Sequence, residues 1–122
     1  MIKKAIIKLF DKLGYRISRA PDKFRFLDYA GYSPESIINK RFYNVGAGSF
    51  FHPYWTNIDF VSDWYAKVQT NVVHYDLMKL EPLPIQPSTA EIIYTSHTIE
   101  HVSEEAVRNL FREAFKALKQ GG

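Results

Sequence analysis

The chain has 122 residues, of which 46% are hydrophobic and 16% aromatic, a composition typical of one globular domain and not of a disordered or multidomain protein. Its 16 Lys and Arg residues against 13 Asp and Glu residues give a formal charge of only +3, so no strong positive field indicates nucleic acid as a partner. Since there is no cysteine for disulfides, thiolate zinc sites or cysteine nucleophiles, and no apolar run of the roughly 18 residues that a membrane span needs, we expect a cytoplasmic protein.

The first segment carries most of the excess positive charge. Residues 1–25 hold eight Lys and Arg residues against two acidic ones. From Ile2 to Leu13 apolar residues recur at the spacing of one helical face, and Gly14 would end that helix. We expect an N-terminal amphipathic helix that packs on the domain or on a neighbouring chain. The alternative is contact of this basic helix with an anionic membrane surface.

The next segment, residues 15–40, mixes charged and aromatic residues with prolines. Residues 33–36 (Ser-Pro-Glu-Ser) resemble a helix start, so we expect a loop with one short helix. The hydrophobic pattern changes at residue 41. We therefore divide the chain into an N-terminal helical and loop extension, residues 1–40, and a main domain, residues 41–122.

Four β-strands and a final helix are expected in the main domain. The strands lie at residues 41–45, 55–59, 71–75 and 91–95. Ser103 would cap the helix, whose apolar face includes Leu110, Phe111 and Phe115, and the Gly121-Gly122 pair would close it. The strands alternate with crossover segments, which favours an α/β fold.

The ends of three of these strands carry residues suited to one nucleoside. A Gly46-x-Gly48 turn follows the first strand, and glycine lets the backbone approach a ligand closely. The second strand ends in Asp59, which can accept hydrogen bonds from a ribose diol. Asp76 and Leu77 follow the third strand, where an adenine could be hydrogen-bonded and stacked.

Together these motifs resemble the class I S-adenosylmethionine-dependent methyltransferases, in particular the group called methyltransferase type 11. Residues 42–49 resemble the family's first motif, 55–59 its second-strand acid, 74–77 its adenine-binding acid, 91–102 its fourth strand with the "EHV" that follows, and 118–122 its "LKPGG" turn. The resemblance implies a Rossmann-like core with an incomplete parallel sheet in the order 3-2-1-4. It also implies methyl transfer to an oxygen or nitrogen of a small molecule or glycan.

The resemblance assigns roles to eleven residues. The residues implied to bind the cofactor, S-adenosyl-L-methionine, are Gly46, Ala47, Gly48, Asp59, Phe60, Asp76, Leu77 and Ser96. The residues implied to act near the transferred methyl group are His97, Glu100 and His101. We expect the neighbouring aromatic residues, among them Phe50 and Trp55, to fill the first crossover and cover the adenine side, and we expect no chemistry from His52 or His74.

Four departures from the family pattern qualify this assignment. Asn44 stands where the family has an acid, and Phe50 where it has a third glycine. Only 13 positions separate Gly46 from Asp59, so we expect the first crossover helix to be a single turn or missing. The family's sheet continues beyond the "GG" turn, so we expect a truncated domain that is catalytically weak by itself.

Truncation would leave the strand at 91–95 as an open edge. Such an edge favours self-association or a covering chain. The alternative function is therefore a non-catalytic cofactor-binding remnant, or an interaction module that docks through this edge and the basic N-terminal helix.

The segment His97-Thr98-Ile99-Glu100-His101 leaves several hypotheses open. It matches the H-x-x-E-H signature of inverted zinc proteases, which requires a helix. It is also similar to an E-x-x-E-H segment that binds a divalent cation in some class I methyltransferases, with His97 in place of the first Glu. The remaining hypotheses are a purely structural pocket floor and a general base at His97 or His101.

Overall fold

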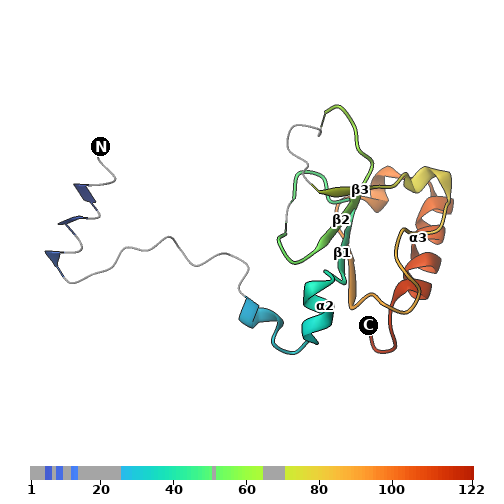
Figure 1. Ribbon diagram of the computed structural model, residues 1–122. Coiled ribbons are helices and arrows are strands. Elements are labelled where there is room, and N and C mark those ends of the chain that lie inside the picture. Colours follow the sequence, from blue (N-terminus) through green and yellow to red (C-terminus); the bar gives the residue numbers. More distant parts are fainter. Residues whose placement is uncertain (1–4, 7, 10–11, 14–25, 51, 65–70) are drawn as a thin grey trace.

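A computed structural model, shown in Figure 1, describes residues 5–6, 8–9, 12–13, 26–50, 52–64 and 71–122. Its centre is a parallel sheet made of β1 (Phe42–Val45), β2 (Thr56–Asp59), β3 (Val72–His74) and β4 (Ile92–Thr95). The strand order β3-β2-β1-β4 confirms the predicted topology. The chain runs outward from β1 through β2 to β3 and then returns to the other side of β1. The switch in direction therefore falls between β1 and β4, the place where open α/β sheets bind ligands.

One face of the sheet packs against α3 (Glu104–Ala117). The core there consists of the buried side chains Val45, Ile58, Tyr75, Leu83 and Leu110. Ser103 begins the helix as predicted, because its side-chain oxygen accepts a hydrogen bond from the backbone N–H of Ala106 at 3.2 Å. Burying this apolar face against the sheet is what holds α3 in place.

The apolar face predicted for this helix is wider than its contact with the sheet. Phe111 is 59% exposed and Phe115 is 82% exposed. The core occupies a narrower stripe that contains Ala106, Leu110 and Ala117. The two phenylalanines therefore lie on the solvent side of α3 and outside the core.

The opposite face of the sheet is covered by aromatic side chains. Phe42 is fully buried, and its ring contacts Tyr29, Tyr32 and Trp55 at centroid distances of 5.1, 4.8 and 5.9 Å. Tyr29 ends the short η1 (Phe26–Tyr29), so the segment before the sheet folds against it. No helix occurs in residues 46–50 and 52–55, the described part of the first crossover, and this agrees with the short spacing between Gly46 and Asp59.

The predicted N-terminal amphipathic helix lies partly outside the described residues. Residues 5–6, 8–9 and 12 are helical, and Ile6, Leu9 and Leu13 are between 44% and 62% exposed. The packing and membrane-surface hypotheses for this helix stay predictions. No helix in the described ranges is long and apolar enough to cross a membrane.

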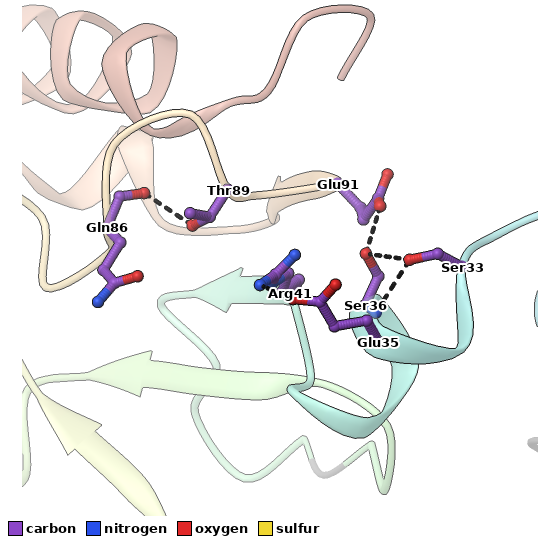
Figure 2. Close-up of polar contacts among 7 residues, drawn as sticks. All are labelled: Ser33, Glu35, Ser36, Arg41, Gln86, Thr89 and Glu91. Carbon is purple, nitrogen blue, oxygen red and sulfur yellow. Dashed lines mark hydrogen bonds and ion pairs between the residues drawn. The ribbon is translucent and has the colours of Figure 1, made fainter.

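A buried carboxylate ties the segment before the sheet to the end of α3. The short α2 (Pro34–Ile38) begins at Ser33 as predicted, and its Ser36 hydroxyl donates a 2.5 Å hydrogen bond to Oε1 of Glu91 (Figure 2). The Lys119 ammonium lies 2.6 Å from Oε2 of the same carboxylate. Glu91 is only 5% exposed and directly precedes β4. Three segments that are distant in sequence therefore meet at one side chain.

This contact predicts how stability depends on pH. Burial acts to raise the pKa of Glu91, but the hydrogen bonds and positive charge of Lys119, together with the Ser36 hydroxyl, lower it below its usual 4.5. A lowered carboxyl pKa means that the stabilisation is present above the unfolded-state pKa and is lost as the pH falls through the folded-state pKa. We expect Glu91→Gln to lower the free energy of unfolding by about 1–3 kcal/mol at neutral pH and to weaken the loss of stability below pH 4.5.

Urea denaturation followed by circular dichroism at neutral and acidic pH would measure both effects. Glu35→Gln is the matched control, because Glu35 also forms an ion pair, with Arg41 at 2.7 Å, but its side chain is 68% exposed. That variant should change stability by no more than about 0.5 kcal/mol. Equal effects of the two substitutions would contradict the structural role of Glu91.

Candidate functional site

An open cleft of about 550 Å³ lies at the carboxyl ends of β1, β2 and β3. We call it the strand-end cleft. Parallel strands end at the same edge of a sheet, so residues far apart in sequence meet there. Of the eleven residues singled out in the sequence, eight line this cleft: Gly46, Gly48, Asp59, Phe60, Asp76, Leu77, His97 and His101.

The turn after β1 depends on its two glycines. Gly46 and Gly48 have φ angles of +72° and +55°, which are left-handed conformations that favour glycine. The Gly46 N–H donates to the carbonyl of Ile58 at 2.8 Å, which fixes the turn beside β2. A Cβ added at Gly46 would lie 2.1 Å from the Thr98 hydroxyl oxygen. Glycine is therefore required at 46 by close packing as well as by conformation, and sequence patterns gave no sign of the contact with Thr98.

Asp59 holds the same turn from the other strand. Its Oδ2 accepts a hydrogen bond from the Gly48 N–H at 2.6 Å, and its Oδ1 accepts one from the Phe60 N–H at 2.7 Å. An ionised carboxylate has about four lone-pair sites, and these two contacts fix its orientation. Asp59 is thus a rigid acceptor at the wall of the cleft.

The end of β3 supplies a second carboxylate and an apolar surface. Asp76 caps the short η2 (Leu77–Lys79) by accepting a hydrogen bond from the Met78 N–H at 3.0 Å. Phe60 and Met78, which both line the cleft, are 51% and 55% exposed. Carboxylates next to exposed apolar side chains suit a ligand that combines hydroxyl or amino groups with a flat ring.

A second pocket, of about 410 Å³, adjoins this cleft. We call it the aromatic pocket. It shares Gly46 and His97 with the strand-end cleft, and its other lining residues are Asn44, Ala47, Phe50, His52, Trp55, Tyr94 and Ser96. Phe50 and Trp55 line this pocket and not the strand-end cleft, and their covering of an adenine stays a prediction. Ala47 and Ser96, predicted with the cofactor residues, also lie here.

His52 is part of a buried polar network beneath the aromatic pocket. It is 8% exposed, and its Nδ1 accepts a hydrogen bond from the Tyr54 backbone N–H at 3.3 Å. Its Nε2 must then carry the proton and donate to the Tyr29 hydroxyl at 2.7 Å, which also accepts from the Trp55 indole N–H at 2.9 Å. Burial lowers the pKa of His52. The fold consequently favours the neutral imidazole.

The segment from His97 to His101 does not form the helix that a zinc protease needs. His97 has a φ of +52°, and η3 (Ile99–His101) is a single 3₁₀ turn. The zinc protease hypothesis is therefore wrong. In the described ranges no group of three His, Cys, Asp or Glu side chains is placed to hold a metal ion, so the divalent-cation hypothesis has no support in the geometry.

His97 and Glu100 nevertheless form a pair at the mouth of the site. His97 Nδ1 lies 3.4 Å from Glu100 Oε1, and the His97 side chain is 91% exposed. A hydrogen bond from its own backbone N–H is the main cause that lowers the pKa of Glu100, with smaller contributions from His101 and His97. Glu100 lies outside the lining of both pockets.

Comparison with known proteins gives a family match. The model of a family described as "Methyltransferase domain" matches residues 46–122, well over half of the chain. No curated protein and no solved structure matches. The matched range begins at the glycine turn and contains α3 and every lining residue of the strand-end cleft except Val45.

Comparing Gly46→Ala with Gly48→Ala distinguishes destabilisation by backbone strain from destabilisation by a steric clash. We expect Gly46→Ala to destabilise the protein clearly more than Gly48→Ala, because only the first forces a Cβ against Thr98. A Cβ at position 48 would have no neighbour within 4 Å. Gly48→Ala should therefore lower the free energy of unfolding only by the strain of alanine in a left-handed conformation, about 1–2 kcal/mol. Thermal and urea denaturation measure the difference. Equal losses would show that Thr98 can move away freely.

The buried imidazole predicts a second pH effect. The pKa of His52 is lower in the folded state than its usual value of 6.5. As the pH falls, His52 therefore becomes protonated in the unfolded chain at a higher pH than in the folded chain. Stability should therefore decline as the pH drops below 6.5 towards the folded-state pKa. His52→Gln should flatten this part of the stability profile, measured by urea denaturation in half-unit pH steps. An unchanged slope would assign the pH dependence to other groups.

Proposed function

The chain belongs to the methyltransferase-domain family, and on that premise we propose that it transfers a methyl group from S-adenosyl-L-methionine to an oxygen or nitrogen of a small molecule or glycan. The observation that carries the proposal is the convergence of Gly46, Asp59 and Asp76 on one cleft from three strand ends. Each of these residues comes from a different strand. Local sequence preferences alone do not require them to meet.

The residues of the strand-end cleft fit the nucleoside part of this cofactor. Asp59 would accept hydrogen bonds from the ribose hydroxyls, and Asp76 from the amino group of the adenine. The half-exposed Phe60 and Met78 offer apolar surface to a purine ring. When bound, the cofactor would supply a sulfonium methyl group, and its transfer to an acceptor hydroxyl breaks the carbon–sulfur bond, forms a carbon–oxygen bond and releases one proton.

The boundary between the two pockets would hold the reacting end of the cofactor. Gly46 lines both pockets, and Ala47 and Ser96 lie just beyond it in the aromatic pocket. His97 also lines both, and an imidazole at this place could accept the proton that an acceptor releases. Glu100 would be a positioning residue that orients His97 through their 3.4 Å contact. For His101, which lines only the strand-end cleft, we propose contact with the cofactor.

A second function is favoured by the outer edge of β4. Among the described residues no strand pairs with that edge, and Tyr94 on the same strand is 49% exposed. An unpaired edge can accept a strand from another molecule. The second proposal is therefore a cofactor-binding interaction module that associates with itself or with a covering chain through β4.

Titration calorimetry with S-adenosylhomocysteine, the methyl-free form of the cofactor, tests the first proposal. We expect binding in the wild type and a loss of more than tenfold in Asp59→Ala, because a charge-assisted hydrogen bond is worth about 1.5–3 kcal/mol. Asp63→Asn is the matched control, since Asp63 is a nearby exposed acid that does not line the cleft. It should bind with wild-type affinity.

Asp59 also holds the Gly48 N–H, so its substitution could act through the turn instead of through the ligand. A ligand without the ribose hydroxyls separates these effects. If Asp59 contacts the diol, the 2′,3′-dideoxy analogue should bind weakly to the wild type. Asp59→Ala should then lower the affinity for this analogue only slightly further. If the losses of affinity from the substitution and from removal of the ribose hydroxyls were fully additive, the ribose assignment would be wrong. If the wild type did not bind S-adenosylhomocysteine at all, the proposed function would be wrong.

A further inference from the structure

The first helical segment of the chain exposes apolar side chains to solvent. The described residues between positions 5 and 12 are helical (Figure 1, blue), and the Leu13 N–H donates to the Leu9 carbonyl at 3.3 Å, the i→i−4 bond of an α-helix. Ile6, Leu9 and Leu13 are 44%, 57% and 62% exposed. Because they are spaced by three and four residues, they lie on one face of the helix. This apolar face is therefore open to solvent.

Lysines accompany the apolar face. Lys8 and Lys12 are both exposed and helical. At about 100° per residue, Lys12 falls at the border of the face that Ile6, Leu9 and Leu13 form, and Lys8 falls behind it. A long lysine side chain at such a border can lay its methylene groups along the apolar surface and keep its ammonium in a polar layer. The helix thus offers an apolar face and positive charge to the same partner.

The positive charge of the chain is concentrated at this end. Residues 1–25 contain eight Lys and Arg residues and two acidic ones, a net charge of +6, whereas the whole chain has a formal charge of +3. Residues 26–122 therefore sum to −3, from eight basic and eleven acidic residues. A chain with this division turns its N-terminal segment towards an anionic surface and keeps the rest away from it.

The helix α3 is a poor partner for this face. Its exposed Phe111 and Phe115 could meet an apolar helix, but Arg108 and Arg112 lie on the same outer side of α3. Docking there would bring the lysines of the N-terminal segment next to arginines, and like charges in contact disfavour an interface. Two copies of the segment would repel each other for the same reason, since each has a net charge of +6 over residues 1–25.

An anionic lipid surface matches both properties of the helix. Its phosphate groups attract lysine, and its acyl chains accept leucine and isoleucine side chains. Nucleic acid would attract the lysines equally well, but a phosphate backbone has no apolar interior for the other face. The lysines also interrupt the apolar sequence every few residues, which suits a helix that lies along a membrane and not one that crosses it.

We propose that the N-terminal helix binds the surface of a membrane that contains anionic lipids. Ile6, Leu9 and Leu13 enter the boundary between headgroups and acyl chains, and Lys8 and Lys12 contact lipid phosphates. The partner is the lipid surface itself, not another protein. This inference does not rest on the proposed function, because none of these residues lines the strand-end cleft or the aromatic pocket.

Co-sedimentation of the full chain with lipid vesicles measures this binding. The neutral vesicles contain phosphatidylcholine alone, and the anionic vesicles contain equal parts of phosphatidylcholine and phosphatidylglycerol. We expect the chain to bind the anionic vesicles at least about tenfold more tightly than the neutral ones. Raising the salt concentration from about 0.05 M to about 0.5 M should remove most of this difference, because salt screens the charges.

Leu9→Gln tests the apolar contact. It places a polar side chain at the centre of the apolar face and should weaken binding to anionic vesicles by about three- to tenfold. Ile38→Gln is the matched control, because Ile38 ends α2, is 78% exposed and lies outside the N-terminal segment. This variant should bind like the wild type.

A double variant, Lys8→Gln with Lys12→Gln, tests the charge. It should weaken binding to anionic vesicles by about tenfold or more and change binding to neutral vesicles little. Lys40→Gln with Lys79→Gln removes the same charge from two exposed lysines elsewhere in the chain. That control should change the affinity by less than about twofold.

Four results would overturn the inference. They are equal binding, or none, to the two kinds of vesicle; wild-type binding by Leu9→Gln; an equal loss in the two double-lysine variants; and, without lipid, a lower melting temperature or a changed mass in light scattering for Leu9→Gln but not for Ile38→Gln. The last result would show that the domain or a second copy covers the apolar face. Titration with S-adenosylhomocysteine is independent of all four, so failure of this inference and failure of the proposed function are distinguishable.

Discussion

The hydrogen bond from the Gly48 N–H to the Asp59 carboxylate is the contact on which the site depends. The described part of the crossover between β1 and β2 contains no helix, so no rigid element holds the turn above the sheet. Asp59 does this at 2.6 Å, helped by the Gly46 N–H that donates to the Ile58 carbonyl at 2.8 Å. Because Gly46 lines both pockets, the shape of each depends on this one side chain at the end of β2.

The turn separates two environments of opposite character. The strand-end cleft contains the carboxylates of Asp59 and Asp76, each oriented by backbone N–H groups. The aromatic pocket contains ring surfaces and a neutral amide, and burial lowers the pKa of His52 in its lining. The two pockets therefore differ in chemistry: one offers charged hydrogen-bond acceptors, and the other offers mainly aromatic contact area.

Local patterns were enough to predict the strands and the Ser103 cap, because both depend on residues close in sequence. The convergence of Asp59 and Asp76 could be predicted only through the expected parallel topology, which brings strand ends together. Local patterns could not predict which of the two pockets Phe50 and Trp55 line, because an irregular crossover has no periodicity to follow. The contact of Thr98 with Gly46 joins two strand ends and exists only in the folded chain. The H-x-x-E-H pattern left several hypotheses open, because its residue spacing fits a helix, but the backbone there makes one 3₁₀ turn.

The close approach of Thr98 to Gly46 also constrains how this chain can change over evolutionary time. A side chain at 46 would overlap Thr98, whose Cβ lies only 2.9 Å from the position that a Cβ at 46 would take. Shortening Thr98 to alanine would not make enough room, so replacing Gly46 requires the backbone after β4 to move as well. Gly46 should therefore stay glycine among descendants of this gene, and divergence should concentrate in the aromatic pocket, where Phe50 and Tyr94 are half-exposed.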